Sequence, residues 1–239
     1  MPATHFTKVS VESASMPVKK PCMTSEEIVI SGIAGRFPEA RDISQFAQTL
    51  FNNTELQLPT NRMHTQRPRT VTFDSQLFNI SQERLRTMTV PMKYLVEQTY
   101  DAIVDSGILP TDLKNTTRTG LFIATCCESI NKTSCNLDNY CELLSTVFQL
   151  NGVTQVFKNQ FGSSFIALDK ARRSILNGEC DQALVCAIDM INEEPTVVSV
   201  FIQRENLCKH TYYMRLKESM IYQDHQKNAE TLKDLYKEW

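Results

Sequence analysis

Short apolar runs that alternate with amphipathic segments place the strongest constraint on how this chain folds. Three uninterrupted apolar runs have the length of a strand: residues 28–30, 121–124 and 183–188. Three other segments carry apolar side chains at helical spacing: residues 43–51, 92–103 and 165–176. The three uninterrupted apolar runs are typical of strands buried on both faces of a mostly parallel sheet. Because strands and amphipathic helices alternate, the sequence predicts an α/β fold with helices layered on a sheet.

Residues that favour helix ends support these boundaries. Asp42 and Gln45 form a predicted capping pair ahead of the first helix. Gly107 is predicted to close the second helix, with Pro110 shortly beyond it, and Asn177-Gly178 is predicted to end the third. Each predicted helix therefore has at least one terminus set by its own sequence.

The two ends of the chain differ from the middle. Residues 1–24 mix Ser, Thr, Pro and Lys without a period, which predicts a flexible leader. Residues 209–239 are predicted to form a divergent, helical tail, which packs on its own domain or faces a partner. One short amphipathic face supports that helix: Leu232, Leu235, Tyr236 and Trp239.

Composition excludes several classes of function. The net charge of −2 and the pI near 6.1 give no electrostatic reason to expect nucleic acid or an anionic membrane as a partner. The sequence has no apolar run long enough for a transmembrane helix and no signal-peptide pattern, so a cytoplasmic location is predicted. The eight cysteines lack C-x-x-C spacing, which favours reduced thiols over disulfides or a zinc site. No cofactor or metal site is predicted, and the sequon-like Asn115 and Asn131 are interpreted as unmodified.

Residues 148–165 resemble, without a gap, the nucleophile segment of β-ketoacyl synthases from animal-type fatty acid synthases and modular polyketide synthases. The family pattern is F-D-F-x-G-P-S-x-x-x-D-T-A-C-S-S-S-L, and its cysteine accepts the acyl group. Its D-T-A-C positions are Lys158, Asn159, Gln160 and Phe161 in this chain. A thiolate attacks a thioester, whereas the benzyl group of Phe161 has no lone pair with which to do so. Phe161 either fills the acyl pocket or reflects the loss of catalytic demand.

Five further segments resemble the same family in the family's order: residues 26–38, 73–78, 88–108, 119–124 and 178–185. The resemblance covers Ser25 to Cys208, with a short deletion between Gly120 and Leu144, and the second half of the family domain has no counterpart. It implies the N-terminal half of a thiolase-like fold, with a mostly parallel or mixed sheet covered by helices. Residues 25–208 are then a truncated ketosynthase-like domain.

The resemblance also implies which catalytic groups to look for, and they are absent. The family's two histidine motifs, H-G-T-G-T and K-S-N-x-G-H, do not occur among the four histidines: His5, His64, His210 and His225. Ser163 and Ser164 are interpreted as helix-capping residues rather than replacement nucleophiles. Cys180 is interpreted as a buried structural thiol. No catalytic residue is therefore assigned, and the family nucleophile position is Phe161.

Three hypotheses about function remain open. The chain is a catalytically inactive ketosynthase-like protein that acts by association, a non-functional remnant or incomplete gene model, or a fragment of an active synthase with 3-oxoacyl-[acyl-carrier-protein] synthase activity. The family would use acyl carrier protein thioesters. The first two hypotheses are favoured because the nucleophile and both histidine motifs are missing.

The resemblance predicts association as well. In the family the helix after Ser164 is covered by the second half of the domain, so an apolar patch is expected on its outer face. The strand before the nucleophile, residues 153–157 here, pairs across the family's two-fold axis. A homodimer, or a heterodimer with an intact synthase, is the predicted assembly.

Overall fold

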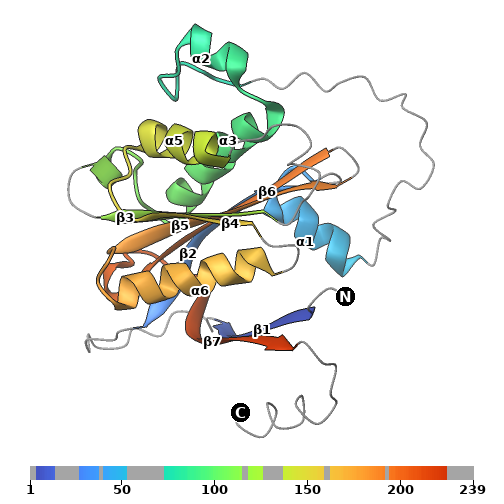
Figure 1. Ribbon diagram of the computed structural model, residues 1–239, viewed down its shortest axis with the longest axis vertical. Coiled ribbons are helices and arrows are strands. Elements are labelled where there is room, and N and C mark those ends of the chain that lie inside the picture. The colour runs from blue at the N-terminus through green and yellow to red at the C-terminus, as the bar shows by residue number, and fades with distance from the viewer. Residues whose placement is uncertain are drawn as a thin grey trace, which may run out of the picture.

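The computed structural model describes residues 4–13, 27–37, 40–52, 73–114, 118–125, 137–158, 162–191 and 194–224. Within these residues the strands form one seven-stranded sheet in the order β1-β7-β2-β6-β5-β3-β4 (Figure 1). Their bounds are β1 Thr4–Ser13, β2 Ile28–Arg36, β3 Thr119–Thr125, β4 Thr154–Lys158, β5 Gln182–Ile191, β6 Glu194–Arg204 and β7 Met214–Asp224. The helices are α1 Ile43–Phe51, α2 Gln82–Thr87, α3 Val90–Asp105, α5 Leu137–Phe148 and α6 Ser163–Leu176, with 3₁₀ turns at Asp112–Lys114 and Glu205–Leu207.

The sheet is mixed, which is one of the two arrangements that the resemblance implied. Strand β3 is parallel to β4 and β5, whereas the β5–β6, β6–β2, β2–β7 and β7–β1 pairs are antiparallel. The three predicted strands are confirmed within β2, β3 and β5. The sequence analysis did not predict β6, which follows β5 directly and pairs Glu194 with Ile191. A connection this short leaves no room for a crossover helix, so the two strands run antiparallel.

The predictions for the two ends of the chain are wrong where the structure describes them. Strand β1 lies in the predicted flexible leader, and β7 lies in the predicted helical tail. The two strands pair with each other, from Thr4 opposite Asp224 to Ser13 opposite Met214. Pairing with a distant segment supplies hydrogen bonds that no local pattern reveals. The amphipathic face from Leu232 to Trp239 lies outside the described residues.

The helix termini follow the sequence closely. Gln45 donates its backbone N–H to Asp42 Oδ1 at 2.8 Å, and Gln45 Oε1 accepts from the Arg41 N–H at 3.0 Å, which confirms the predicted capping pair. Gly107 has φ of +77°, and its N–H donates to Val104 O at 2.9 Å, so α3 ends at the predicted glycine. Asn177 and Gly178 end α6 in the same way.

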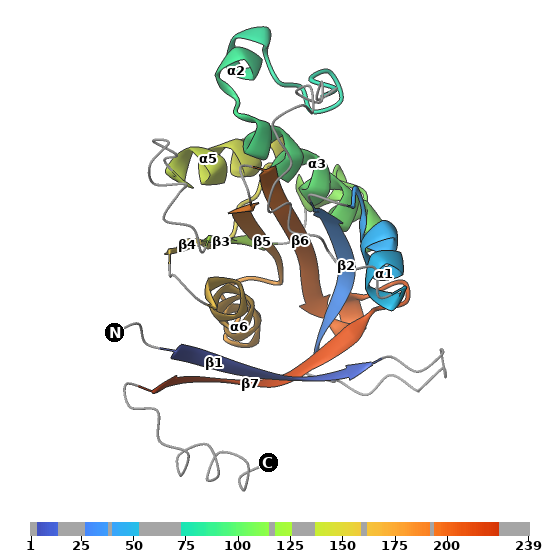
Figure 2. The ribbon, with the colours of Figure 1, turned by 90° about the vertical axis from the view of Figure 1, so that its right-hand side faces the viewer.

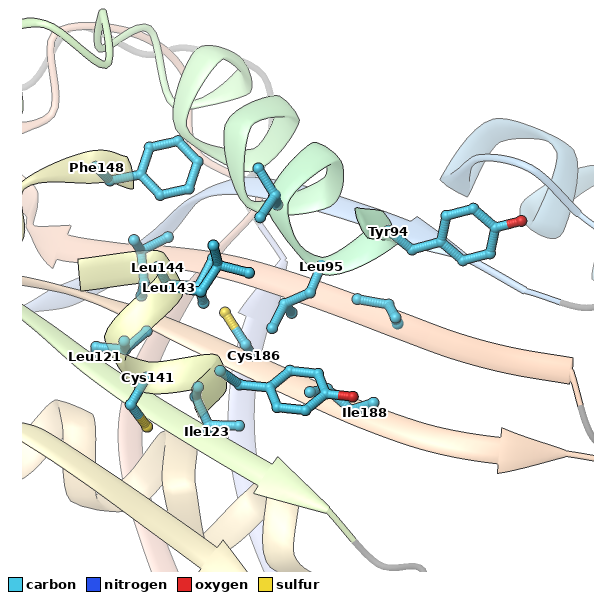
Figure 3. Close-up of a cluster of buried hydrophobic side chains, with 14 of the residues drawn as sticks. Tyr94, Leu95, Leu121, Ile123, Cys141, Leu143, Leu144, Phe148, Cys186 and Ile188 are labelled. Carbon is cyan, nitrogen blue, oxygen red and sulfur yellow. The ribbon is translucent and has the colours of Figure 1, made fainter. Parts of the chain in front are cut away.

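Helices cover both faces of the sheet, α3 and α5 on one and α6 on the other (Figure 1). The α3/α5 face holds the larger core cluster, in which Leu95, Leu144 and Leu121 are fully buried (Figure 3). Helix α3 approaches β2 closely at Gly32, where a Cβ atom would lie 2.0 Å from the Ala102 carbonyl oxygen. Only glycine fits that position, which explains this residue of the first family-like segment.

Two predicted apolar stripes are more exposed than expected. No residue of α1 is buried, and Leu50 and Phe51 are among its exposed side chains. On α6, Phe165 is 48% exposed, whereas smaller residues fill the face toward the sheet: Ser163, Ala167, Ala171 and Ser174. The helix prediction was correct. Its predicted buried stripe is confirmed at Ile175, which is fully buried, and is wrong at Phe165, whereas Leu168 and Leu176 are partly buried against the core.

Candidate functional site

The segment that resembles the family's nucleophile region joins β4 to α6, and this junction is called here the β4–α6 elbow. It consists of Lys158, where β4 ends, and residues 162–164, where α6 begins. Gly162 has φ of +72°, a left-handed conformation that glycine adopts without strain. Residues 159–161 lie outside the described residues, so the interpretation of Phe161 stays a prediction from the sequence.

Ser163 fastens the elbow to the neighbouring strand. Its side chain is 3% exposed, and its hydroxyl donates a hydrogen bond to the Thr125 carbonyl oxygen at 2.9 Å. Thr125 is the last residue of β3, so the bond fixes the start of α6 at the carboxyl end of the parallel β3–β4 pair. The predicted capping role is wrong: Gly162 is the N-cap and no side chain caps this helix. The Ser163 hydroxyl donates its hydrogen bond to the Thr125 carbonyl oxygen of β3 instead of capping the helix, and Ser164 is exposed.

The electrostatics of the elbow come from the helix backbone. The first turn of α6 contains no acidic side chain, so nothing there offsets the positive end of the helix dipole. The Ile166 N–H donates to the Gly162 carbonyl oxygen at 3.0 Å, which shows that regular helical bonding starts at the elbow. The elbow therefore keeps a backbone arrangement that lowers the pKa of a thiol placed at a helix start.

The cysteines of the described residues are free thiols: Cys141, Cys180, Cys186 and Cys208. Burial raises the pKa of Cys180 to about 11, although the Gly120 backbone N–H lowers it slightly. Burial also raises the pKa of Cys141 to about 11 and raises that of Cys186 and Cys208. Thiols with raised pKa values are poor nucleophiles at neutral pH. The interpretation of Cys180 as a buried thiol fits its fully buried position.

His210 is an exposed residue that lies against Gly107, where α3 ends. The side chain of His5 and the whole of His64 and His225 fall outside what the structure describes. No group of His, Cys, Asp and Glu in the described part of the chain could hold a metal ion. No helix of the described residues is long and apolar enough to cross a membrane.

The outer face of α6 is less apolar than the resemblance predicted. Phe165 is the large hydrophobic side chain of this helix that is exposed within the described residues, and Lys170 and Arg173 are exposed on the same helix. The helix also contacts β1 and β7. An extensive apolar patch is therefore not present on the described part of α6, because charged residues and the two outer strands occupy that side.

Strand β4 is the edge of the sheet and pairs only with β3 among the described strands. Its residues are exposed or half-buried, with Val156 and Phe157 packed partly against the two core clusters. The predicted strand at residues 153–157 is thereby confirmed, one residue later in the chain. Its outer edge presents backbone groups that another strand could pair with.

The sequence profile described as "Beta-ketoacyl synthase, N-terminal domain" matches residues 25–212. The chain belongs to this ketosynthase family. Its relatives include a fatty acid synthase from Anser anser anser, 25% identical over 198 residues that cover 72% of this chain and 56% of the relative. The orsellinic acid synthase armB of Armillaria mellea is 23% identical over 80% of this chain and 10% of that protein. The chain spans about half the length of the first of these relatives, and far less of the second.

Solved ketosynthase structures share the fold. The oxazolomycin ketosynthase domain OzmH KS7 of Streptomyces albus JA3453 superimposes with a TM-score of 0.61 at 18% identity, covering 76% of this chain and 43% of that one. The ketosynthase from module 1 of the bacillaene synthase of Bacillus amyloliquefaciens FZB42 superimposes with a TM-score of 0.60 at 17% identity. This match covers 76% of this chain and 41% of that one. This ketosynthase-family chain therefore has the N-terminal part of the thiolase-like fold, as the sequence predicted.

Proposed function

We propose that this chain is a catalytically inactive, truncated ketosynthase-like protein that acts by association with itself or with an intact synthase. The observation that carries the proposal is Phe161 at the position of the family's nucleophilic cysteine. A phenyl ring cannot form a thioester, so the acyl-enzyme intermediate of the family has no place to form.

The surroundings of the elbow supply no substitute nucleophile among the described residues. The Ser163 hydroxyl is buried and bonded to the Thr125 carbonyl oxygen. The described thiols are held in their protonated form by burial, which raises their pKa. A nucleophile also needs an adjacent base or a lowered pKa, and the sequence lacks both histidine motifs.

A condensation assay tests inactivity directly. The purified chain is incubated with acyl and malonyl thioesters of acyl carrier protein, beside an intact ketosynthase as the positive control. We expect no β-ketoacyl product above the buffer control. We expect the same for F161C, because a restored thiol still lacks the histidines that polarise the carbonyl and assist decarboxylation. Product formation by the natural sequence above background refutes the proposal.

The alternative is a fragment of an active 3-oxoacyl-[acyl-carrier-protein] synthase that obtains its missing groups from another chain. The observation in its favour is the retained elbow, with Gly162 in the left-handed region and an uncompensated helix start. In that case F161C should be acylated rapidly by an acyl thioester, and an added synthase chain should convert the acyl group to product. Because the elbow favours a reactive thiol under either proposal, acylation alone does not separate them. Loss of the acyl group from F161C after the synthase chain is added, followed by mass spectrometry, does.

Association is proposed to use the free edge of β4. The Leu121 N–H donates to the Val153 carbonyl oxygen at 2.8 Å, which sets the phase of the parallel ladder. By alternation, the N–H groups of Thr154 and Val156 point away from β3 and are free to bond another strand. Thr154 is exposed, so its side chain can be changed without disturbing the core.

A proline at position 154 removes an outward donor and places a ring at the edge. We expect T154P to weaken a dimer about fivefold or more, since one hydrogen bond contributes about 1 kcal/mol. The matched control T154A keeps the N–H and should dimerise as the natural chain does. Sedimentation at micromolar concentration measures both. A well-folded monomer for the natural chain, or equal behaviour of T154P and T154A, argues against the β4 edge.

The remnant hypothesis makes a different prediction, which is that no native polypeptide of this sequence accumulates. Intact-mass measurement of the native protein tests it. If the chain accumulates with a synthase partner, we expect it in the cytoplasm, and co-purification with a tagged full-length chain identifies that partner.

A further inference from the structure

Strand β7 has two neighbouring strands at its start and one beyond it. Residues Met214, Arg215 and Leu216 pair with β2 at the edge of the main sheet. The same three residues pair with β1 on their other side, and beyond Leu216 the strand pairs with β1 alone among the described strands, in a register that continues to Asp224 opposite Thr4. The two strands form a ribbon that runs past α6 on the side away from β3 and β5 (Figures 1 and 2). We call residues 4–13 and 217–224 the β1–β7 ribbon.

The outward face of α6 is partly buried even though the main sheet does not cover it. Ala167 and Ala171 face the sheet, so Asp169, Arg172 and Leu176, spaced at i, i+3 and i+7, lie on the opposite side of the helix. Asp169 is nevertheless only 3% exposed. Because α6 contacts both β1 and β7, the ribbon is the layer that lies on this side.

Arg172 joins the helix to the ribbon where β7 leaves β2. Its Nε donates to the Leu216 carbonyl oxygen at 3.2 Å, and its Nη2 donates to the Lys217 carbonyl oxygen. Leu216 is 4% exposed and belongs to the core cluster beneath α6. Hydrogen bonds from a charged donor are about twice as strong as neutral ones, so this junction is the strongest polar contact between α6 and β7 among the bonds described.

The other side of β7 is anchored at the same point. Arg215 Nε lies 2.9 Å from Glu27 Oε2, and its Nη2 lies 2.6 Å from Glu205 Oε1. The base of the ribbon is thus held by Arg215 toward the sheet and by Arg172 toward the helix. Past Lys217, the ladder with β1 is the regular pairing that holds the strand.

We infer that the β1–β7 ribbon is a strap closed over the outward face of α6, with Arg172 as its clasp. The strap gives α6 a second layer from the chain's own two end segments, so the helix does not need a separate domain half to be covered. A partner that docks on this face of α6 must first release the strap. Opening it exposes Asp169 and Leu176 to solvent or to that partner.

Hydrogen exchange of the full chain tests the clasp. In R172M we expect the amides of residues 216–224 to exchange about tenfold faster or more, because a charged donor to two carbonyls is lost. The amides of β3 and β5 should keep their natural rates. The control K170M removes an exposed cation two residues away on the same helix and should leave all rates unchanged. Equal exchange in R172M and K170M, or ribbon amides that exchange like exposed coil in the natural chain, overturns the inference.

A register test remains informative if R172M fails to fold. Phe6 and Tyr222 are directly opposed in the ribbon, at a separation that suits a disulfide. Under mild oxidation, F6C/Y222C should form the crosslink faster than the diagonal pair F6C/D224C, as measured by peptide mass spectrometry. Crosslinking at equal rates, or in neither variant, shows that the ribbon does not form in solution.

Discussion

The two faces of the sheet are built on different principles. On the α3/α5 face, large side chains such as Phe148, Leu95 and Leu144 fill the space between helices and strands (Figure 3). On the α6 face, small residues such as Ala167, Ala171 and Ala183 bring the helix close to the sheet. The first face is packed mainly by large side chains, whereas alanines make up much of the contact of α6 with the second face.

This difference shows where the stability of the fold resides. Burial of a whole leucine side chain contributes about 1.5–3 kcal/mol, and an alanine methyl contributes far less. The α3/α5 face has the larger cluster of such side chains and therefore supplies the larger share of the hydrophobic stabilisation, although Phe122, Ile175 and Ile202 are also fully buried in the cluster on the α6 face. The α6 face positions the elbow instead, because close contact between small residues fixes the helix relative to β3 and β4.

The largest expected effect is a cavity on the α3/α5 face. Leu144 is fully buried in α5, and L144A should lower the free energy of unfolding by about 2–5 kcal/mol in urea titrations. The control L77A removes a leucine that is 56% exposed and should change stability by less than about 0.5 kcal/mol. If L144A costs no more than L77A, the α3/α5 face is not the main core.

The α6 face should respond to added volume. Ala171 is fully buried between α6 and the sheet, so A171L should push the helix outward and cost about 1–3 kcal/mol. K170L places the same side chain at the neighbouring exposed position and serves as the control. Thermal unfolding of both variants measures the difference. A neutral A171L contradicts close packing of α6 on the strands.

The smallest expected effect is a pH dependence from α3. Burial raises the pKa of Glu97, with the Arg36 guanidinium opposing and the Asp101 carboxylate adding to the shift. A raised carboxyl pKa means that the folded state holds its proton more tightly than the unfolded state. Stability from this group is therefore present at low pH and lost as pH rises through the folded-state pKa.

Replacing Glu97 with glutamine should remove that loss. E97Q is expected to be slightly more stable than the natural chain at pH 7 and to lack the advantage at low pH. E83Q, on an exposed glutamate of α2, is the control and should follow the natural chain. Unfolding midpoints across pH 4 to 8 provide the measurement, and parallel curves for E97Q and E83Q show that burial of Glu97 is unimportant.

Local patterns determined much of the fold. The three helices, the strands at 28–30, 121–124 and 183–188, and the helix ends at Gly107 and Asn177-Gly178 were all predicted correctly. These features depend on periodicity and on backbone preferences within a few residues, which a sequence displays directly. The replacement at Phe161 is likewise a fact of the sequence, and the proposal of inactivity depends on it.

Other features were decided only by contacts between distant segments. Nothing near residues 4–13 or 214–224 indicates that they pair, because the hydrogen-bond partners come from opposite ends of the chain. The role of Ser163 changed from a cap to a tether because the Thr125 carbonyl lies within reach of its hydroxyl. Phe165 is exposed whereas Ile175, from the same predicted apolar stripe, is fully buried against the sheet. The sequence by itself determined the elements and the missing nucleophile, and the tertiary structure decided which faces are buried, because burial depends on what packs against each residue.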